Sequence, residues 1–67
     1  MTPEKALELA IDRAGGIKAV AGLFDITVQA IYGWGVCPPK RVLALEEAAG
    51  GAVTKHQLRP DIYGPPP

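Results

Sequence analysis

Glycine and proline divide this chain into short segments, and that division limits the secondary structure it can form. Paired glycines lie at Gly15-Gly16 and Gly50-Gly51, and Pro38-Pro39 lies between them. Glycine accepts the left-handed backbone of a helix end, and proline is tolerated in the first turn of a helix but not in its interior. Each stretch between these breaks therefore has room for one or two short helices.

The first stretch has the features of a helix from Thr2 to Ala14. Thr2 is a suitable N-cap, and Pro3 suits the first helical position. Apolar residues then recur at helical spacing: Leu7, Ala10, Ile11 and Ala14. The glycine pair that follows ends the helix.

Two further helices are predicted before the proline pair. The second carries a stripe at Ile17, Val20, Ala21 and Phe24. Thr27 can cap a third helix that carries Ala30, Ile31 and Trp34. Gly33, Gly35 and the two prolines then close it and force a connector.

The proline pair opens a fourth helix, and the C-terminal part is less regular. Pro39 begins this helix, whose buried stripe is Val42, Leu45 and Ala49 with Leu43 alongside. Further on, the run from Thr54 to Gln57 matches a capping box and predicts a short fifth helix from about Lys55 to Arg59.

Pro60 should end that helix, so that Ile62 and Tyr63 lie in an extended tail that folds back on the core. Pro65-Pro66-Pro67 should form a solvated polyproline end. The competing interpretation makes a strand of residues 52–58.

The predicted fold class is all-α, a compact bundle of about five short helices, and the alternative is α+β with a C-terminal β-hairpin. The chain has 67 residues, of which 1–64 form a single domain and 65–67 the proline tail. A chain of this length buries only about 60% of the surface that its unfolded form exposes. Its core must therefore be efficient, or a partner must complete it.

The stretch from Gly16 to Trp34 has the spacing of a helix-turn-helix unit. Ala21 is the small residue where the second helix of the unit crosses the first closely. Asp25 stands four residues later, where the turn needs a residue that tolerates positive φ. Ile26, Ile31 and Trp34 then point back to the core. This layout leaves an outer face that would enter the major groove: Thr27, Val28, Gln29, Tyr32 and Gly33.

Four residues of that outer face each have a possible DNA contact and a competing role. Gln29 can form a bidentate pair with adenine, or be an exposed glutamine without a function. Thr27 can contact a phosphate, although capping is the safer role. Val28 can touch a thymine methyl or pack on a neighbouring helix, and Tyr32 can contact the groove wall or a second copy of the chain.

The formal net charge of zero counts against tight nonspecific DNA binding, since phosphate contacts dominate affinity. The candidates for phosphate contacts are Lys18, at the start of the second helix, and the pair Lys40 and Arg41. Arg41 could instead pair with Glu46. The other basic side chains are expected to be ordinary surface charges: Lys5, Arg13, Lys55 and Arg59.

The chain has few residues suited to covalent or metal chemistry. Its single Cys37 can form no internal disulfide, and with the single His56 it cannot build a zinc site. Cys37 is expected to be a small loop or core residue and His56 to face solvent. No catalytic residues, no metal, no cofactor and no enzymatic activity are expected. A bacterial or phage-infected cytoplasm fits the lone thiol, and no stretch approaches the roughly 20 apolar residues of a membrane span.

Three stretches together resemble the YdaS-like and Cro-like helix-turn-helix repressors of prophages. They are residues 16–34, residues 38–46 and residues 51–64, with Leu58-Arg59-Pro60-Asp61 as the most specific part. The resemblance implies a sequence-specific repressor that acts on its own operators. It also implies caution about the fold, because Cro-like relatives include both all-helical and α+β C-terminal halves.

Two features depart from that family. The loop after Trp34 is only Gly35-Val36-Cys37, without positive charge, and Asp25 stands where a glycine is common. Both predict weak phosphate anchoring. We expect a homodimer on an inverted-repeat duplex DNA operator, formed either in free solution or only on DNA, with Ile62-Tyr63 as one candidate dimer surface. The alternative function is a protein-interaction or antitoxin-like helical module.

Overall fold

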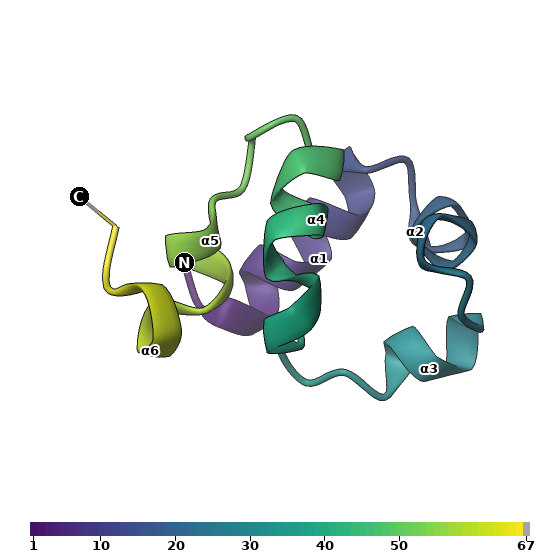
Figure 1. The fold of residues 1–67 in the computed structure, drawn as a ribbon, viewed down its shortest axis with the longest axis horizontal. Coiled ribbons are helices and arrows are strands. Elements are labelled where there is room, and N and C mark those ends of the chain that lie inside the picture. The colour runs from purple at the N-terminus through teal and green to yellow at the C-terminus, as the bar shows by residue number, and fades with distance from the viewer. Residues whose placement is uncertain (67) are drawn as a thin grey trace.

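The computed structural model describes residues 1–66, so Pro67 of the expected polyproline end lies outside the described residues. The elements follow in the order α1 (Pro3–Arg13), α2 (Ile17–Phe24), α3 (Val28–Tyr32), the 3₁₀ turn η1 (Pro39–Arg41), α4 (Val42–Ala48), α5 (Lys55–Leu58) and α6 (Pro60–Tyr63). Figure 1 shows α1 and α4 crossing near the centre, with α2 and α3 on one side and α5 and α6 on the other. Residues 1–66 hold no strand, which confirms the all-α class and makes the β-hairpin alternative wrong.

Three threonines begin three of the helices. The Oγ1 atoms of Thr2, Thr27 and Thr54 accept hydrogen bonds from the backbone N–H three residues later, at 3.2, 3.1 and 3.3 Å. Each bond satisfies a donor that the first turn of a helix would leave unpaired. At α5 the Gln57 side chain also accepts from the Thr54 N–H at 2.9 Å, which completes the predicted capping box.

The core lies where α1, α4 and α5 meet. The fully buried side chains include Leu45, Leu58, Val20, Val42 and Val53. The predicted stripe of α4 is therefore confirmed, but Leu43, expected alongside it, is 55% exposed. With about 100° between successive residues, Leu43 points away from the side that carries Val42 and Leu45.

The turn between α2 and α3 depends on the conformation of Asp25. Its φ of 55° and ψ of 48° are left-handed, and no other non-glycine residue among 1–66 has a positive φ. The Ile26 N–H can then donate to the Ala21 carbonyl at 3.0 Å, which satisfies the end of α2. The prediction for Asp25 is confirmed.

Helix α3 is shorter than the sequence predicts, because it ends at Tyr32 and not at Trp34. The Trp34 N–H still donates to the Ile31 carbonyl at 2.9 Å, so the chain closes with a tight turn. Trp34 is half-buried and packs against the core, as expected.

The C-terminal part differs from the prediction at three points. Pro60 does not lead into an extended tail, because it occupies the first position of α6, where its missing N–H has no cost. Tyr63 packs against the core as expected, but Ile62 is 47% exposed. His56 does not face solvent freely: it is half-buried, and its Nδ1 donates to the Gly64 carbonyl at 3.2 Å.

Arg59 is not an ordinary surface charge. Its guanidinium donates to the Cys37 carbonyl at 3.0 Å and forms a two-bond pair with the Asp61 carboxylate at 3.0 and 2.8 Å. Arg59 thus ties the start of α6 to the connector that precedes η1. The hydrogen bond from Arg59 also lowers the pKa of the Asp61 carboxyl below its usual value.

Candidate nucleic-acid interface

Helices α2 and α3 form a two-helix unit at one end of the molecule (Figure 1). Val20 and Ala21 of α2 and Ile31 of α3 are buried and join the unit to the common core. Ala21, predicted as the small residue at the helix crossing, is buried, and its carbonyl accepts the Ile26 N–H that closes α2. The unit has the layout of a helix-turn-helix, with α3 in the place of the helix that enters the major groove.

Most of the predicted outer face of α3 is exposed. Thr27, Gln29, Tyr32 and Gly33 are exposed, and Tyr32 is 73% accessible. The Thr27 hydroxyl accepts the capping bond, so capping is a role that the structure assigns to it. The Thr27 side chain nevertheless remains at the surface beside the first turn.

Val28 and Ala30 exchange the positions that the sequence predicts for them. Val28 is half-buried and packs against the core, so its expected place on the outer face is corrected. Ala30, predicted on the inner side, is exposed between Gln29 and Gly33. The packing of Val28 and Ile31 against the core sets how α3 is rotated, and a methyl at position 30 is a group that can meet a thymine methyl.

The three candidate phosphate contacts have different environments. Lys18 and Lys40 are exposed, whereas Arg41 is half-buried with its guanidinium carbon 4.8 Å from the centre of the Phe24 ring. The Phe24 ring in turn lies 6.4 Å from Trp34 at an interplanar angle of 46°. Arg41 therefore joins η1 to the end of α2 through a cation–π contact.

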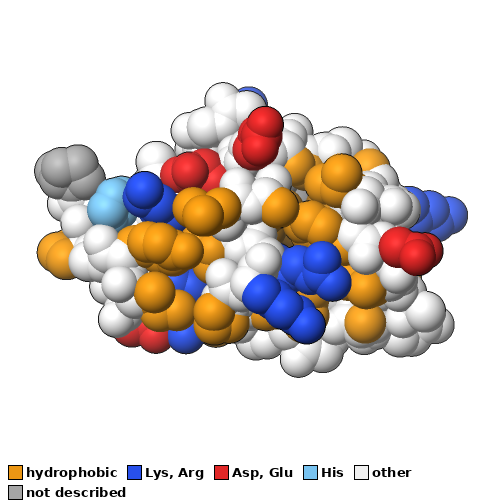
Figure 2. Space-filling model, in the orientation of Figure 1, with side chains coloured by type: hydrophobic (Ala, Val, Ile, Leu, Met, Phe, Trp, Pro, Cys, Tyr) orange, Lys and Arg blue, Asp and Glu red, His pale blue; other side chains and the backbone are white. Residues whose placement is uncertain are grey.

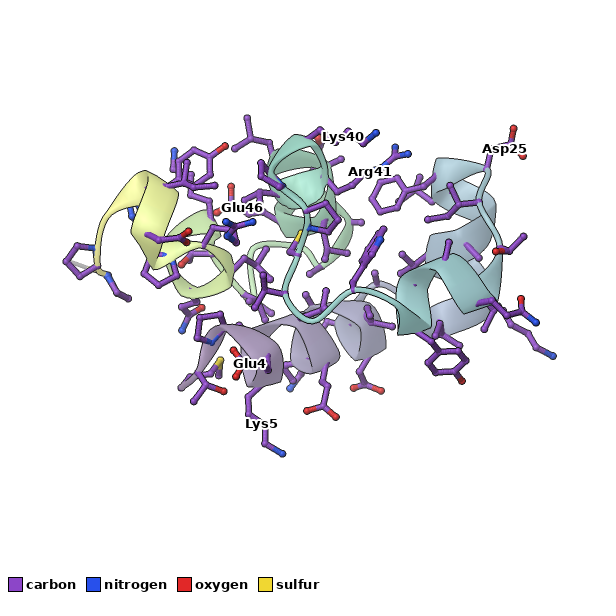
Figure 3. All side chains as sticks on the ribbon, turned by 90° about the horizontal axis from the view of Figure 1, so that it is seen from below. Glu4, Lys5, Asp25, Lys40, Arg41 and Glu46 are labelled. Atoms are coloured by element: carbon purple, nitrogen blue, oxygen red, sulfur yellow. The ribbon has the colours of Figure 1, made fainter. Side chains whose placement is uncertain are left out.

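The alternative pairing of Arg41 with Glu46 does not form. Glu46 instead accepts a hydrogen bond from the Lys55 backbone N–H at 2.7 Å. In Figure 3, Lys40 and Arg41 lie on the same side of the molecule as Asp25, and Glu4 and Lys5 of α1 lie on the opposite side. Figure 2 shows basic side chains over the start of α4, next to the α2–α3 unit.

A groove of about 430 Å³ separates α1 from the α2–α3 unit. Its apolar wall includes Ile11, Ile17 and Trp34, and Glu8 and Asp12 stand on its α1 side. Tyr32 lines the same groove, so it lies beside acidic groups as well as on the outer face of α3. The groove therefore has the opposite charge from the basic pair near η1.

The only thiol of the chain is buried and protonated. Cys37 is fully buried, and burial raises the pKa of its thiol to about 11, although the nearby Arg59 guanidinium offsets part of that effect. At neutral pH the thiol is protonated and is a poor nucleophile. Within residues 1–66 no cluster of three metal-binding side chains occurs. No helix in that range is long and apolar enough to cross a membrane.

One family model matches residues 7–67, and it carries the description "Bacterial toxin YdaS". The match includes α2, α3 and the segment after Leu58, which are among the stretches that carry the resemblance in sequence. No curated protein and no solved structure matches the chain.

Proposed function

The chain belongs to the family described as bacterial toxin YdaS, and on that premise we propose that it binds duplex DNA sequence-specifically through α3. In this proposal it is a transcriptional repressor of the Cro-like prophage type, and it acts as a binding protein and not as an enzyme. Two copies occupy an inverted-repeat operator, and neither cofactor nor metal takes part.

The left-handed turn at Asp25 is the observation that carries this proposal. It fixes α3 against α2 in the helix-turn-helix layout and leaves Thr27, Gln29 and Tyr32 in solvent. Three polar side chains on one exposed helical face at the end of the molecule can reach base edges in a major groove. Ala30 adds a small apolar group between them.

Few phosphate contacts support that face. Lys18 is exposed at the start of α2, and Lys40 is exposed in η1, while Arg41 is held on the Phe24 ring. Each neutralised phosphate adds close to one unit to the slope of log affinity against log salt. With two to three such contacts per copy and two copies on the operator, the slope should be modest, about four to five units.

The experiment is an NMR titration of the labelled chain with the duplex upstream of its own gene, repeated at several salt concentrations. We expect shifts at Lys18 and from Thr27 to Gly33, with little change in α5 and α6. Shifts confined to α1, or none at a concentration far above operator affinities, would show that α3 does not bind DNA.

The variant Gln29→Ala separates base reading from general contact. We expect it to weaken binding to the operator by roughly tenfold and to leave binding to random DNA unchanged, because an amide reads adenine only in the specific complex. Lys5→Ala, on the opposite side of the molecule, is the matched control and should change neither. Equal losses on both duplexes for Gln29→Ala would remove its base-reading role.

The groove favours a second candidate, a protein-interaction module. Its apolar wall and the Glu8 and Asp12 carboxylates suit a basic segment of a partner protein with one or two apolar side chains. In that case the partner would shift the NMR signals of Ile11, Ile17 and Trp34, and duplex DNA would shift nothing at α3.

A further inference from the structure

The outward face of η1 and α4 carries exposed side chains that the core of this chain does not use. Lys40 of η1 and Leu43, Ala44 and Glu47 of α4 are all exposed, and they follow one another at intervals of three, one and three residues. Within α4 this spacing places Leu43, Ala44 and Glu47 on the side opposite the buried Val42 and Leu45. The exposed Lys40 lies in η1, the turn that leads into α4. Figure 2 shows basic side chains at the start of α4 and hydrophobic atoms beside them.

This face is complementary to itself. Along the sequence, the midpoint of the four residues falls between Leu43 and Ala44, with Lys40 and Glu47 the same number of residues from it. When two copies of α4 are placed antiparallel about a two-fold axis through that midpoint, Lys40 of each copy meets Glu47 of the other. At the centre each Leu43 meets the small Ala44, which permits close approach of the helices.

Within residues 1–66 no salt bridge neutralises these charges. The salt bridges in that range join Lys5 to Glu8 and Arg59 to Asp61, and neither involves α4. Leu43 is one of the large hydrophobic residues that remain exposed. A two-fold contact would bury it and pair two charges at each end of the interface.

We propose that the α4 face (Lys40, Leu43, Ala44, Glu47) is the surface through which two copies of this chain associate as an antiparallel, two-fold dimer. The inference rests on the two-copy part of the proposed function and deepens it. It replaces Ile62-Tyr63 as the dimer surface, because Tyr63 is already packed against its own core.

The small area of this interface predicts a low affinity between the two copies. One helix of seven residues with its leading turn buries less than the roughly 1,200 Å² at which stable interfaces begin. We therefore expect association only at high protein concentration in free solution, and adjacent half-sites raise the effective concentration on DNA. In this arrangement Lys40 pairs with Glu47 of the other copy. A phosphate contact is the competing role of Lys40.

A charge-swap experiment tests the pairing without DNA. Lys40→Glu and Glu47→Lys are prepared separately, and self-association is followed by sedimentation from about 10 µM to 1 mM, with far-UV circular dichroism as the check on folding. Each variant alone places like charges together at both ends of the interface, and we expect its association to weaken by roughly tenfold or more.

An equimolar mixture of the two variants should restore association to the wild-type level. In the mixed dimer the two substituted side chains, one from each copy, face each other with opposite charges at one end of the interface. At the other end the unsubstituted Lys40 and Glu47 pair as they do in the wild type. Both ends are therefore attractive again.

The matched control is the pair Lys5→Glu and Glu8→Lys, which makes the same charge changes on α1 and should leave association unchanged. A wild-type chain that is monomeric at 1 mM overturns the proposal. So does a dimer that the single α4 variants do not weaken, or a mixture that fails to restore it, because the contact then uses another face. Since no DNA is present, none of these results bears on whether α3 binds an operator, and the titration of α3 does not bear on α4.

Discussion

Helices α1, α4 and α5 bury Leu7, Leu45 and Leu58 in the core, whereas α2 and α3 bury Val20, Ala21 and Ile31 and leave Leu23 and Tyr32 largely in water. Leu45 and Leu58 are completely buried, but Leu23 of α2 is 57% exposed and Tyr32 of α3 is 73% exposed. Hydrogen bonds add to the first region: Glu46 of α4 accepts from the Lys55 N–H at the start of α5, and Arg59 donates to the Cys37 carbonyl. Besides its buried Val20, Ala21 and Ile31, the α2–α3 unit is held by its threonine cap and by the Arg41 contact with Phe24.

The contrast separates two tasks in one small domain. The region of α1, α4 and α5 supplies the stability, and the α2–α3 unit supplies exposed groups on a short helix that it holds in place. Substitutions should therefore have different consequences in the two regions, and the following measurements test that difference.

The largest effect should come from Leu45→Ala. It removes a fully buried side chain where three helices meet, and such truncations lower the free energy of unfolding by about 2–5 kcal/mol. Chemical denaturation followed by circular dichroism measures this loss. Leu43→Ala, two residues earlier on the same helix but exposed, is the control and should change stability by less than about 0.5 kcal/mol in dilute solution. Equal losses would contradict the assignment of the buried side of α4.

Removal of the α3 cap should have a smaller effect. Thr27→Ala removes the acceptor for the Ala30 N–H and should lower the free energy of unfolding by about 1 kcal/mol. Amide exchange should show the opening localised at residues 28–32, because α3 packs chiefly against α2. Thr27→Ser keeps the hydroxyl and should keep the stability. Faster exchange throughout α4 and α5 would mean that the two regions open together.

Substitution of Asp25 should sharpen the comparison further. Asp25→Gly relieves a left-handed conformation that a side chain rarely adopts, and we expect the free energy of unfolding to rise by about 0.5 kcal/mol. Asp25→Ala lacks the polar side chain that makes this conformation tolerable, and should lower stability by about 1 kcal/mol. Chemical denaturation of the two variants measures both changes. If glycine destabilises the chain, the turn is held by a contact of the Asp25 carboxylate.

The smallest expected effect is the pH dependence of stability that comes from the Arg59–Asp61 pair. The hydrogen bond from the Arg59 guanidinium lowers the pKa of the Asp61 carboxyl, so the pair contributes stability that is fully present above the ordinary carboxyl pKa and is lost as pH falls through the lowered one. Asp61 is largely exposed, and solvent screens the pair. Acid unfolding curves of the wild type and Asp61→Asn should differ slightly at neutral pH and converge at low pH. A difference that grows on acidification would contradict this sign.

Local signals in the sequence predict much of this fold. The threonine caps, the turn at Asp25 and the α4 stripe of Val42 and Leu45 are each decided within one or two helical turns. The predictions therefore agree with the structure there. Because the helix-turn-helix spacing depends on the same local features, the place of the candidate site was also predictable.

The remaining features depend on contacts between distant residues. No local pattern links Arg59 to the carbonyl of Cys37, which is 22 residues earlier. The rotation of α3, which buries Val28 and exposes Ala30, comes from packing in a helix too short for its own periodicity to decide. Pro60 is compatible with ending one helix and with beginning another, and here α5 ends at Leu58 while α6 begins at Pro60 itself.

Trp34 is the only tryptophan, and it lies where the two regions of the molecule join. It lies beside Phe24, lines the groove next to α1 and packs against the core. The fluorescence of Trp34 therefore reports on the contact between the two regions. Its indole emission should shift to longer wavelength when the α2–α3 unit separates from α1, before the far-UV signal of the remaining helices is lost. A fluorescence melt compared with a circular dichroism melt would show directly whether this domain unfolds in one step or two.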